Sequence, residues 1–363
     1  MGMGDELRRL DTLEGWRMKL GLLLGYKGAA GGPDMELVLE AERLGYDSVW
    51  TSESWASDAV TPAAWVLART SKIKVGTGIM QMSARTPSCA AMTAMSLQAM
   101  SGGRFLLGIG PSGPQVIEGW HGEVFGKPLK RTREYIEIIR KIFERKSPLT
   151  FQGEFYQIPN TGPGTTGLGK PLKSIMHPDP NLKIYTGSFA PAGLRTAGAV
   201  ADGVQPIFMI PEKSALVREY VEEGRMKAGR SANLADFDIA PFVRIQMGDD
   251  LQACRDAIKG ELAFYIGGMG ARTKNFYNDY AKRLGYEDAA VKIQDAFLEG
   301  RRADAVAAVP DALVDDIALV GTPDRIKDRL QVWKAAAADR SIGSMLLGVR
   351  DIDTLRAVAE AAA

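Results

Sequence analysis

Histidine and cysteine are scarce in this chain of 363 residues, and their scarcity argues against several kinds of enzyme. His121 and His177 each stand alone, whereas a two-metal hydrolase needs several histidines and aspartates at its strand ends. No Gly-x-Ser-x-Gly motif occurs, so a Ser-His-Asp hydrolase is not indicated. Cys89 and Cys254 are far apart and lack Cys-x-x-Cys spacing, which argues against a disulfide framework or zinc site. We therefore expect no metal and a reducing, cytoplasmic location.

A charge imbalance and long apolar runs are also missing. The chain has 45 Lys and Arg residues against 44 Asp and Glu residues, so no nucleic acid or charged membrane surface is expected as a partner. No apolar run reaches membrane-spanning length, and residues 1–17 are too charged for a secretory signal. We expect a soluble protein with a charged amino-terminal extension over residues 1–17.

Short apolar runs alternate with helical patterns along the rest of the chain. Eight of these runs predict strands, at 18–26, 47–53, 72–79, 103–110, 181–187, 202–208, 237–247 and 343–349. Two longer excursions, at about 147–181 and 249–310, interrupt the alternation, and the second is mostly helical in pattern. Eight βα units predict an α/β fold, a (β/α)8 TIM barrel that forms a single domain over residues 18–363 with two insertions. A doubly wound sheet with a helical lobe is the alternative.

The active site of such a barrel lies at the carboxyl ends of its strands, which here are rich in glycine, aromatic and amide residues. In "KVGTGIMQM" (74–82), two glycines inside a strand indicate a bulge or a close approach by another group. Glu53 is the only acidic residue at such an end in the first half; it is either an acid, base or ligand contact or a buried carboxylate satisfied by backbone. "GIGPSGPQ" (108–115) either approaches a cofactor or forms a tight turn. A site with few acids and bases suits chemistry carried by a cofactor, such as a tricyclic redox ring.

Several longer stretches are recognisable: "KVGTGIMQMSARTP", "MSGGRFLLGIGPSGPQVIEGW", "TGPGTTGLGKPLK" and "VPDALVDDIALVGTPD". In these the chain resembles the bacterial luciferase-like superfamily, and within it the deazaflavin oxidoreductases that depend on coenzyme F420. The resemblance covers nearly the whole chain after residue 17. It implies a barrel with insertions, usually a homodimer, and a non-prolyl cis peptide bond between Gly78 and Ile79 that bulges the strand against the deazaflavin ring. Gly76 would ease packing beneath the bulge.

The resemblance also implies roles for individual residues. Glu53 and Gln81 would be catalytic, orienting the ring or relaying a proton, and Ser188 to Ala190 would hold the cofactor's phosphate or ribityl chain. The implied cofactor-binding set is Glu53, Ser54, Gly78, Ile79, Gln81, Ser112, Gly113, Pro114, Gln115, Gly187, Ser188, Phe189 and Ala190. Sugar-phosphate dehydrogenases of this kind carry an Asp-His pair and a loop glutamate where this chain has Glu53-Ser54 and Gly113, so glucose-6-phosphate is not the expected substrate.

The expected function is hydride transfer between C5 of coenzyme F420 and an unidentified small organic substrate, with residues 160–173 closing over the site. A reduced-FMN-dependent luciferase-like monooxygenase is the alternative, because the two ring systems are nearly isosteric. A non-catalytic protein that binds the cofactor is a third interpretation.

Overall fold

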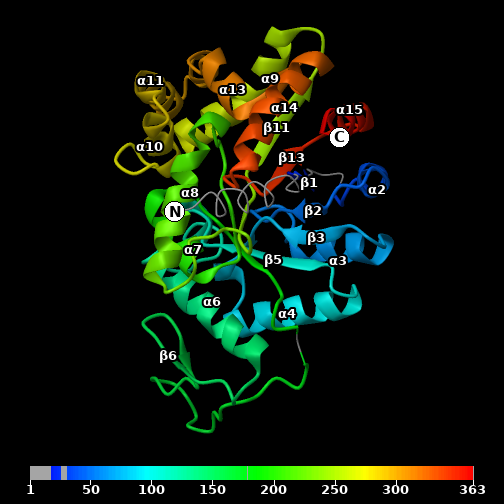
Figure 1. The fold of residues 1–363 in the computed structure, drawn as a ribbon. Helices are drawn as coiled ribbons and strands as arrows, with labels where there is room; N and C mark the ends of the chain where they lie inside the picture. Colours follow the sequence, from blue (N-terminus) through cyan, green and yellow to red (C-terminus); the bar gives the residue numbers. More distant parts are fainter. Residues whose placement is uncertain (1–17, 26–30, 178, 363) are drawn as a thin grey trace, which may run out of the picture.

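The computed structural model describes residues 18–25, 31–177 and 179–362, and the predicted extension at 1–17 lies outside the described residues (Figure 1). The barrel strands are β1 (Lys19–Leu23), β2 (Ser48–Thr51), β3 (Lys74–Thr77), β4 (Met80–Gln81), β5 (Phe105–Gly110), β8 (Ile184–Gly187), β9 (Gly203–Gln205), β10 (Asp238–Ile239), β11 (Phe242–Met247) and β13 (Ser344–Gly348). Their spatial order is β10-β9-β8-β5-β3-β2-β1-β13-β11, with β4 on β5. Because spatial neighbours follow one another along the chain, the fold is the predicted barrel and not a doubly wound sheet.

The barrel closes through its seventh strand, which the sequence predicts as one piece over 237–247. The structure divides it: β10 pairs with β9, and β11 pairs with β13. Pro241 lies between the two pieces and has no N–H to donate, while its carbonyl accepts from the Leu346 N–H at 2.9 Å. A parallel bridge between Ile207 and Phe242 completes the join.

Helices follow the strands and cover the outside of the barrel (Figure 1). They are α2 (Met35–Arg43), α3 (Val60–Arg69), α4 (Pro87–Met100), α6 (Pro128–Glu144), α7 (Pro191–Val200), α8 (Ser214–Lys227), α14 (Pro323–Ala338) and α15 (Ile352–Ala362). The main core, which includes Val49, Val75 and Leu347, lies in one large apolar cluster of strand and helix residues. A smaller cluster contains Trp50 and Tyr185, whose rings meet edge to face at 5.0 Å.

The two excursions differ in structure. The first, 147–181, contains the hairpin β6 (Phe151–Gln152) and β7 (Gln157–Ile158) and is otherwise irregular. The second contains α9 (Leu251–Ala263), the π-helix η3 (Phe264–Gly268), α10 (Phe276–Arg283), α11 (Glu287–Leu298) and α12 (Arg302–Ala307) around its own apolar core. It is followed by α13 (Asp311–Ile317) and by β12 (Ala318–Gly321), a strand that the sequence analysis missed and that pairs with β11.

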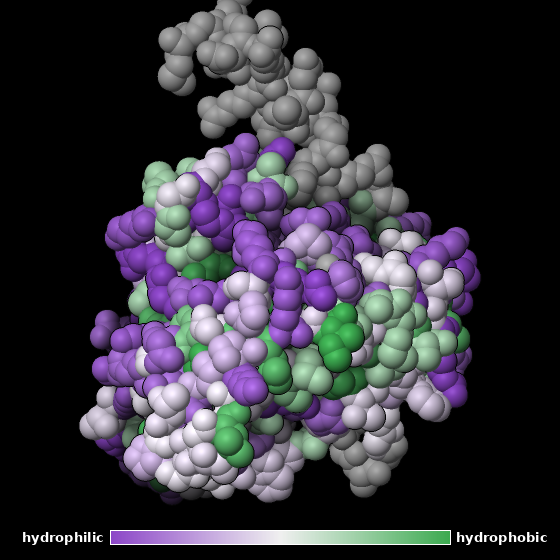
Figure 2. Space-filling view, turned by 90° about the horizontal axis from the view of Figure 1, so that it is seen from below, coloured by the Kyte–Doolittle hydropathy of each residue, from purple (hydrophilic) through white to green (hydrophobic). Residues whose placement is uncertain are grey.

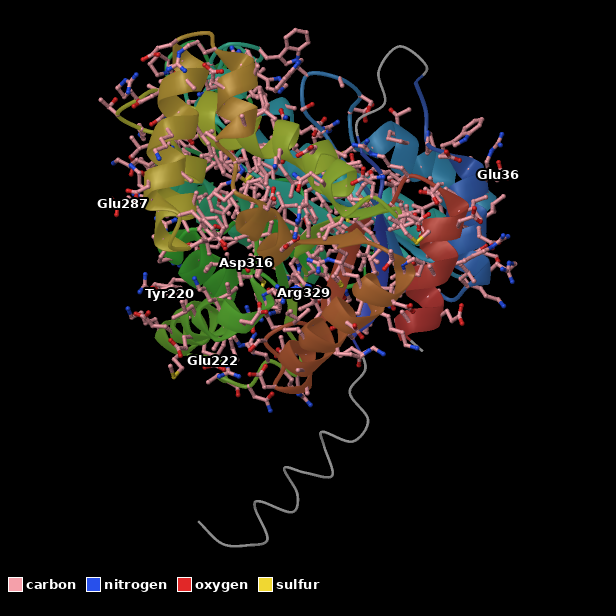
Figure 3. All side chains as sticks on the ribbon, turned by 90° about the horizontal axis from the view of Figure 1, so that it is seen from above. Glu36, Tyr220, Glu222, Glu287, Asp316 and Arg329 are labelled. Carbon is pink, nitrogen blue, oxygen red and sulfur yellow. The ribbon has the colours of Figure 1, made fainter. Side chains whose placement is uncertain are left out.

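Arg329 on α14 contacts Asp316 on α13, and a tyrosine of the second excursion bonds the same aspartate. Its guanidinium donates to the Asp316 carbonyl at 2.8 Å and pairs with Glu212. Figure 3 shows Asp316 and Arg329 next to each other. The Tyr286 hydroxyl donates to the Asp316 carboxylate at 2.6 Å. These contacts fix the helical excursion at the end of the barrel where the strands finish.

Candidate active site

A cavity of about 1300 Å³ lies between the carboxyl ends of the barrel strands and the helical excursion. Its walls come from the ends of β2, β3, β5, β8, β9 and β11, from the first turns of α6 and α7, and from α9, η3 and α10. Small-molecule sites commonly enclose about 300–1,000 Å³. The cavity is therefore large enough for a cofactor and a second ligand together.

A bulge in the third strand forms part of the cavity floor. Gly76 pairs with Leu106 and Met80 pairs with Ile109, so three residues on one strand oppose two on its neighbour. The peptide bond between Gly78 and Ile79 is cis, as predicted. The Thr77 hydroxyl bridges the gap, because it donates to the Gly108 carbonyl at 2.6 Å and accepts from the Gly108 N–H at 3.0 Å.

The glycines around the bulge make room for two particular side chains. A Cβ at Gly76 would collide with the buried indole of Trp50, so this glycine eases packing beneath the bulge, as predicted. A Cβ at Gly110 would lie 2.8 Å from the Ile79 side chain, and one at Gly187 would lie 3.1 Å from it. Ile79 thus occupies a notch between two glycines at the cavity surface.

Glu53 lines the cavity and lies at the centre of a hydrogen-bonded network. Its carboxylate accepts from Arg85 at 2.9 Å and from the Gln81 N–H at 2.6 Å. The Gln81 side chain continues the network to His121, whose Nε2 lies 2.5 Å from the amide oxygen of Gln81. The Tyr135 hydroxyl donates to the Arg85 carbonyl at 3.1 Å and so holds the backbone of the arginine in place. No sequence pattern joins Arg85 or His121 to Glu53, and the sequence analysis missed both.

Most of the implied cofactor-binding set faces this one cavity. Gln81 and Gln115 are absent from its lining, and Gln81 is fully buried behind Glu53. Ser112 adopts φ 60°, a left-handed conformation that turns the loop after β5. The members that line the cavity are Glu53, Ser54, Gly78, Ile79, Ser112, Gly113, Pro114, Gly187, Ser188, Phe189 and Ala190.

Two helix amino termini meet on one side of the cavity. The first residues of α6 and α7 line it, and neither helix has a side-chain cap on its free N–H groups. Lys127 and Lys130 face the cavity there, and both pair with Glu154 in the hairpin of the first excursion. These two lysines hold the pKa of Glu154 at about 2. Exposed N–H groups and cationic side chains make this side suitable for an anion.

Comparison with known proteins identifies the family of this chain. The family described as luciferase-like monooxygenase matches residues 22–340. The chain belongs to the luciferase-like monooxygenase family. It is 44% identical over 321 residues to the Mycobacterium tuberculosis protein named "Putative coenzyme F420-dependent oxidoreductase Rv3520c", covering 88% of this chain and 92% of that one. It is 27% identical over 314 residues to 5,10-methylenetetrahydromethanopterin reductase of Archaeoglobus fulgidus, covering 85% and 88%.

Solved structures share the luciferase-like fold. The coenzyme F420-dependent tetrahydromethanopterin reductase of Methanopyrus kandleri aligns with a TM-score of 0.73 at 22% identity, over 95% of this chain and 98% of that one. An F420-dependent secondary alcohol dehydrogenase in complex with an F420–acetone adduct aligns with a TM-score of 0.73 at 17% identity, over 95% and 98%.

An aromatic wall distinguishes one side of the cavity in this luciferase-like protein. We define it as Phe189, Phe208, Tyr265 and Tyr277, all of which line the cavity. Tyr277 lies 4.9 Å from Tyr265 and 5.1 Å from Phe189, measured between ring centroids. Phe208 adopts φ 50°, an unusual conformation for a bulky residue. The sequence analysis missed this wall, because its members come from the segments after β8 and β9, from η3 and from α10.

Residues 160–173 lie elsewhere, contrary to the expected closure. None of them lines the cavity. The irregular segment after the hairpin packs near the carboxyl end of α6. There the Leu149 N–H donates to the Leu172 carbonyl at 2.8 Å, and the Arg145 guanidinium donates to the Ser174 carbonyl at 2.8 Å. In a barrel, that end of a helix is remote from the carboxyl ends of the strands.

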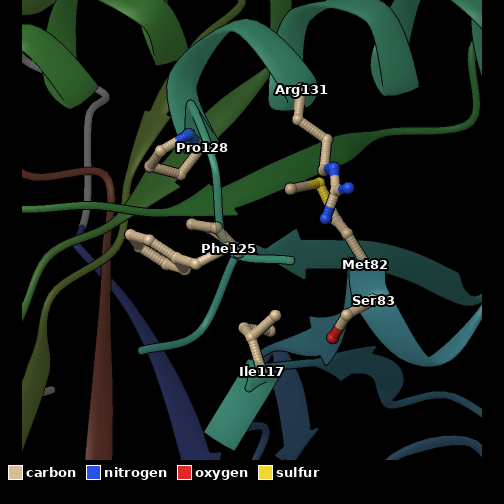
Figure 4. A pocket seen from close by; sticks show the side chains of 7 residues that line it. Met82, Ser83, Ile117, Phe125, Pro128 and Arg131 are labelled. Atoms are coloured by element: carbon tan, nitrogen blue, oxygen red, sulfur yellow. The ribbon is translucent and has the colours of Figure 1, made fainter. Parts of the chain in front are cut away.

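A second, much smaller pocket lies beside the main one (Figure 4). Its volume of about 10 Å³ is that of roughly one water molecule. Ser83 and Arg131 face it, and the Ser83 hydroxyl and the Arg131 Nε find no hydrogen-bond partner among the described residues. The pocket is too small for a substrate or cofactor.

Within residues 18–25, 31–177 and 179–362, histidine, cysteine and carboxylate side chains form no group of three or more that could hold a metal ion. In the same part of the chain, no helix has the length and apolarity needed to cross a membrane.

Proposed function

We propose that this protein is a coenzyme F420-dependent oxidoreductase that transfers a hydride between C5 of the deazaflavin and a small organic substrate. The observation that carries the proposal is the bulge at Gly78 and Ile79 on the floor of a large cavity, in a chain 44% identical to a relative named for coenzyme F420. The residues of the bulge, Gly78 and Ile79, have no polar side chains, so a flat aromatic ring can pack against them.

The residues around the cavity fit this cofactor. Gly78 and Ile79 would support the ring, since glycines at 110 and 187 leave space for the Ile79 side chain at the surface. Ser188 to Ala190 precede the amino terminus of α7, where free N–H groups would bind the cofactor's phosphate. A buried amide at Gln205, which has no partner among the described residues, supplies a polar contact on the same floor.

When bound, the deazaflavin would supply the hydride chemistry itself. In the proposal, Glu53 orients the ring edge or holds a proton, and the Arg85 guanidinium at 2.9 Å fixes its carboxylate. Gln81 acts through its backbone N–H on Glu53 and through its side chain on His121. The aromatic wall stands on the side formed by the helical excursion, and we assign that side to the organic substrate and to the exclusion of water.

Fluorescence titration with coenzyme F420 and, separately, with FMN tests the proposal. We expect saturable quenching of F420 fluorescence and much weaker binding of FMN. Reduction or oxidation of bound F420 at its visible absorbance band, on mixing with candidate alcohols, aldehydes or enones, then identifies the substrate and the direction of transfer. Tight FMN binding together with oxygen consumption would instead support the monooxygenase alternative.

We also propose that the chain forms a homodimer through an apolar patch on α4 and the first excursion. The exposed apolar side chains on these two segments, which we group as the proposed patch, are Met92, Met100, Leu168, Leu172 and Ile175. Ile175 is 93% exposed and Met100 is 82% exposed, while Ser96 on α4 lies 3.9 Å from the Met176 sulfur, which connects the two segments. Figure 2 views the molecule from below, the side on which the first excursion lies in Figure 1. Large exposed apolar patches mark interfaces. Sedimentation of the wild type and of Ile175→Glu/Met100→Glu tests this, with a monomeric variant expected.

A single domain over residues 18–363 and a cytoplasmic location complete the proposal. Tyr286 of the helical excursion donates to Asp316, whose carbonyl accepts from Arg329 on the barrel helix α14, and this connection supports one folding unit. Cys89 is exposed and both cysteines are unpaired, which suits a reducing compartment. One cooperative calorimetric transition and recovery in the cytoplasmic fraction are the expected results.

A further inference from the structure

Gln205 is a buried glutamine that the proposed mechanism leaves without an assigned partner. It ends β9, lines the cavity and is 2% exposed. Neither its amide nitrogen nor its amide oxygen has a hydrogen-bond partner among the described residues. Burying an amide without partners is unfavourable, so a buried amide of this kind calls for a partner from outside the described residues. The cost suggests that this glutamine is kept for binding.

The surroundings of Gln205 indicate which ligand it meets. Its amide oxygen lies 3.4 Å from the position that a Cβ on Gly78 would take, and the Phe242 ring lies 3.1 Å from the same position. The same oxygen lies 3.4 Å from the Cβ position of Gly108. The amide therefore stands beside the bulge, at the edge of the wall that would support the ring. The aromatic wall lies instead on the side of the cavity that we assign to the substrate.

We propose that Gln205 recognises the inner edge of the ring bound against the Gly78–Ile79 bulge, and that this edge carries an N–H beside a carbonyl. This inference rests on the proposed function, which places a deazaflavin ring on the bulge. A primary amide offers one acceptor oxygen and two donor hydrogens from a single side chain. It therefore complements a cyclic amide or imide, whose N–H and C=O lie side by side in the pyrimidine ring of deazaflavins and flavins alike. A ring without such an edge would leave both atoms unsatisfied.

Gln205→Met tests the inference, because methionine keeps the length of the side chain and removes both polar atoms. We expect the ligand-free variant to have a higher Tm than the wild type, since a buried unpartnered amide is gone. We expect its affinity for coenzyme F420, from fluorescence titration, to fall about tenfold, as for the loss of roughly one good hydrogen bond. Gln331→Met, an exposed change on α14, should alter neither quantity.

The outcomes separate this inference from the proposed function. Unchanged F420 affinity in Gln205→Met, or a lowered Tm without ligand, would overturn the role of Gln205 and leave the cofactor assignment intact. A wild type that binds FMN in place of F420 would overturn the cofactor, and the role of Gln205 would then stand or fall on the FMN affinity of Gln205→Met. Should Gln205→Met fail to fold, Gln205→Leu also removes both polar atoms and should weaken binding of either ring.

Discussion

The Glu53 carboxylate and the Arg85 guanidinium form a nearly buried ion pair, with Arg85 Nη1 2.9 and 3.0 Å from the two carboxylate oxygens. The side chains are 6% and 16% exposed. Because the Gln81 N–H also donates to this carboxylate at 2.6 Å, one acid links the cavity surface to the strand after the bulge. Removing the Glu53 charge leaves the Arg85 guanidinium with only the Asp58 carboxylate, 3.6 Å from Nη2, as a counter-charge, and this loss is destabilising for a largely buried cation.

Glu53→Gln should lower both turnover and stability. The amide keeps the shape of the side chain but cannot neutralise Arg85 or hold a proton as a carboxylate does. We expect kcat to fall on the order of 10²-fold, the usual size of an acid–base contribution, together with a lower Tm. In the double variant Glu53→Gln/Arg85→Met, Tm should recover in part while kcat stays low. Equal activity in Glu53→Gln would refute an acid–base role.

Gly110→Ala should harm ring binding more than folding. The added methyl group would lie 2.8 Å from the far end of the flexible Ile79 side chain, so it would push Ile79 out of its notch and into the cavity. We expect F420 affinity to fall several-fold with only a small change in Tm. Gly25→Ala is the matched control: Gly25 also lines the cavity, but no atom lies within 4 Å of its Cβ position. Equal effects of the two changes on affinity would contradict the notch.

Local patterns predicted the barrel and indicated a bulge or a close approach in the third strand, and the family resemblance was needed to choose the bulge. Each strand is a short apolar run, and the glycines at 76 and 78 directly report close approaches, to Trp50 and to Phe242. The division of the seventh strand at Pro241 was not predicted. The sequence on both sides of this proline is extended and apolar, so it indicates one strand, although β10 pairs with β9 and β11 pairs with β13.

The parts of the site that were missed depend on contacts between distant segments. Arg85 reaches Glu53 across 32 positions, and His121 reaches Gln81 across 40. Gln205 reads as an ordinary strand residue, and only the folded chain reveals that its amide has no partner among the described residues. The residues at 160–173 looked like a lid because they are rich in glycine, but composition gives no information about which end of the barrel a loop covers.

Glu154→Gln should strengthen binding of the anionic cofactor. Its carboxylate neutralises Lys127 and Lys130 at the amino terminus of α6, and without it both charges would face the cavity. We expect F420 affinity to rise a few-fold at low ionic strength and the gain to vanish at about 1 M salt, where charges are screened within ~3 Å. Glu144→Gln, which removes the partner of Lys146 at the other end of α6, should leave affinity unchanged. Weaker binding in Glu154→Gln would contradict an anion site at this end.

Asp238→Asn should stabilise the protein at neutral and alkaline pH. Burial raises the pKa of Asp238 above its ordinary value of 3.8, against the hydrogen bonds from Ser344 at 2.7 Å and Tyr185 at 3.0 Å. The native state therefore retains this proton at a pH where the unfolded chain has lost it, so the free energy of unfolding falls as pH rises above about 3.8. Asparagine keeps an oxygen for both donors and cannot ionise. We expect Tm of Asp238→Asn to exceed that of the wild type at pH 8 and to approach it at pH 4, while Asp328→Asn on the exposed face of α14 shows no such trend. A gain in Tm of the same size at both pH values would mean that packing, and not ionisation, is responsible.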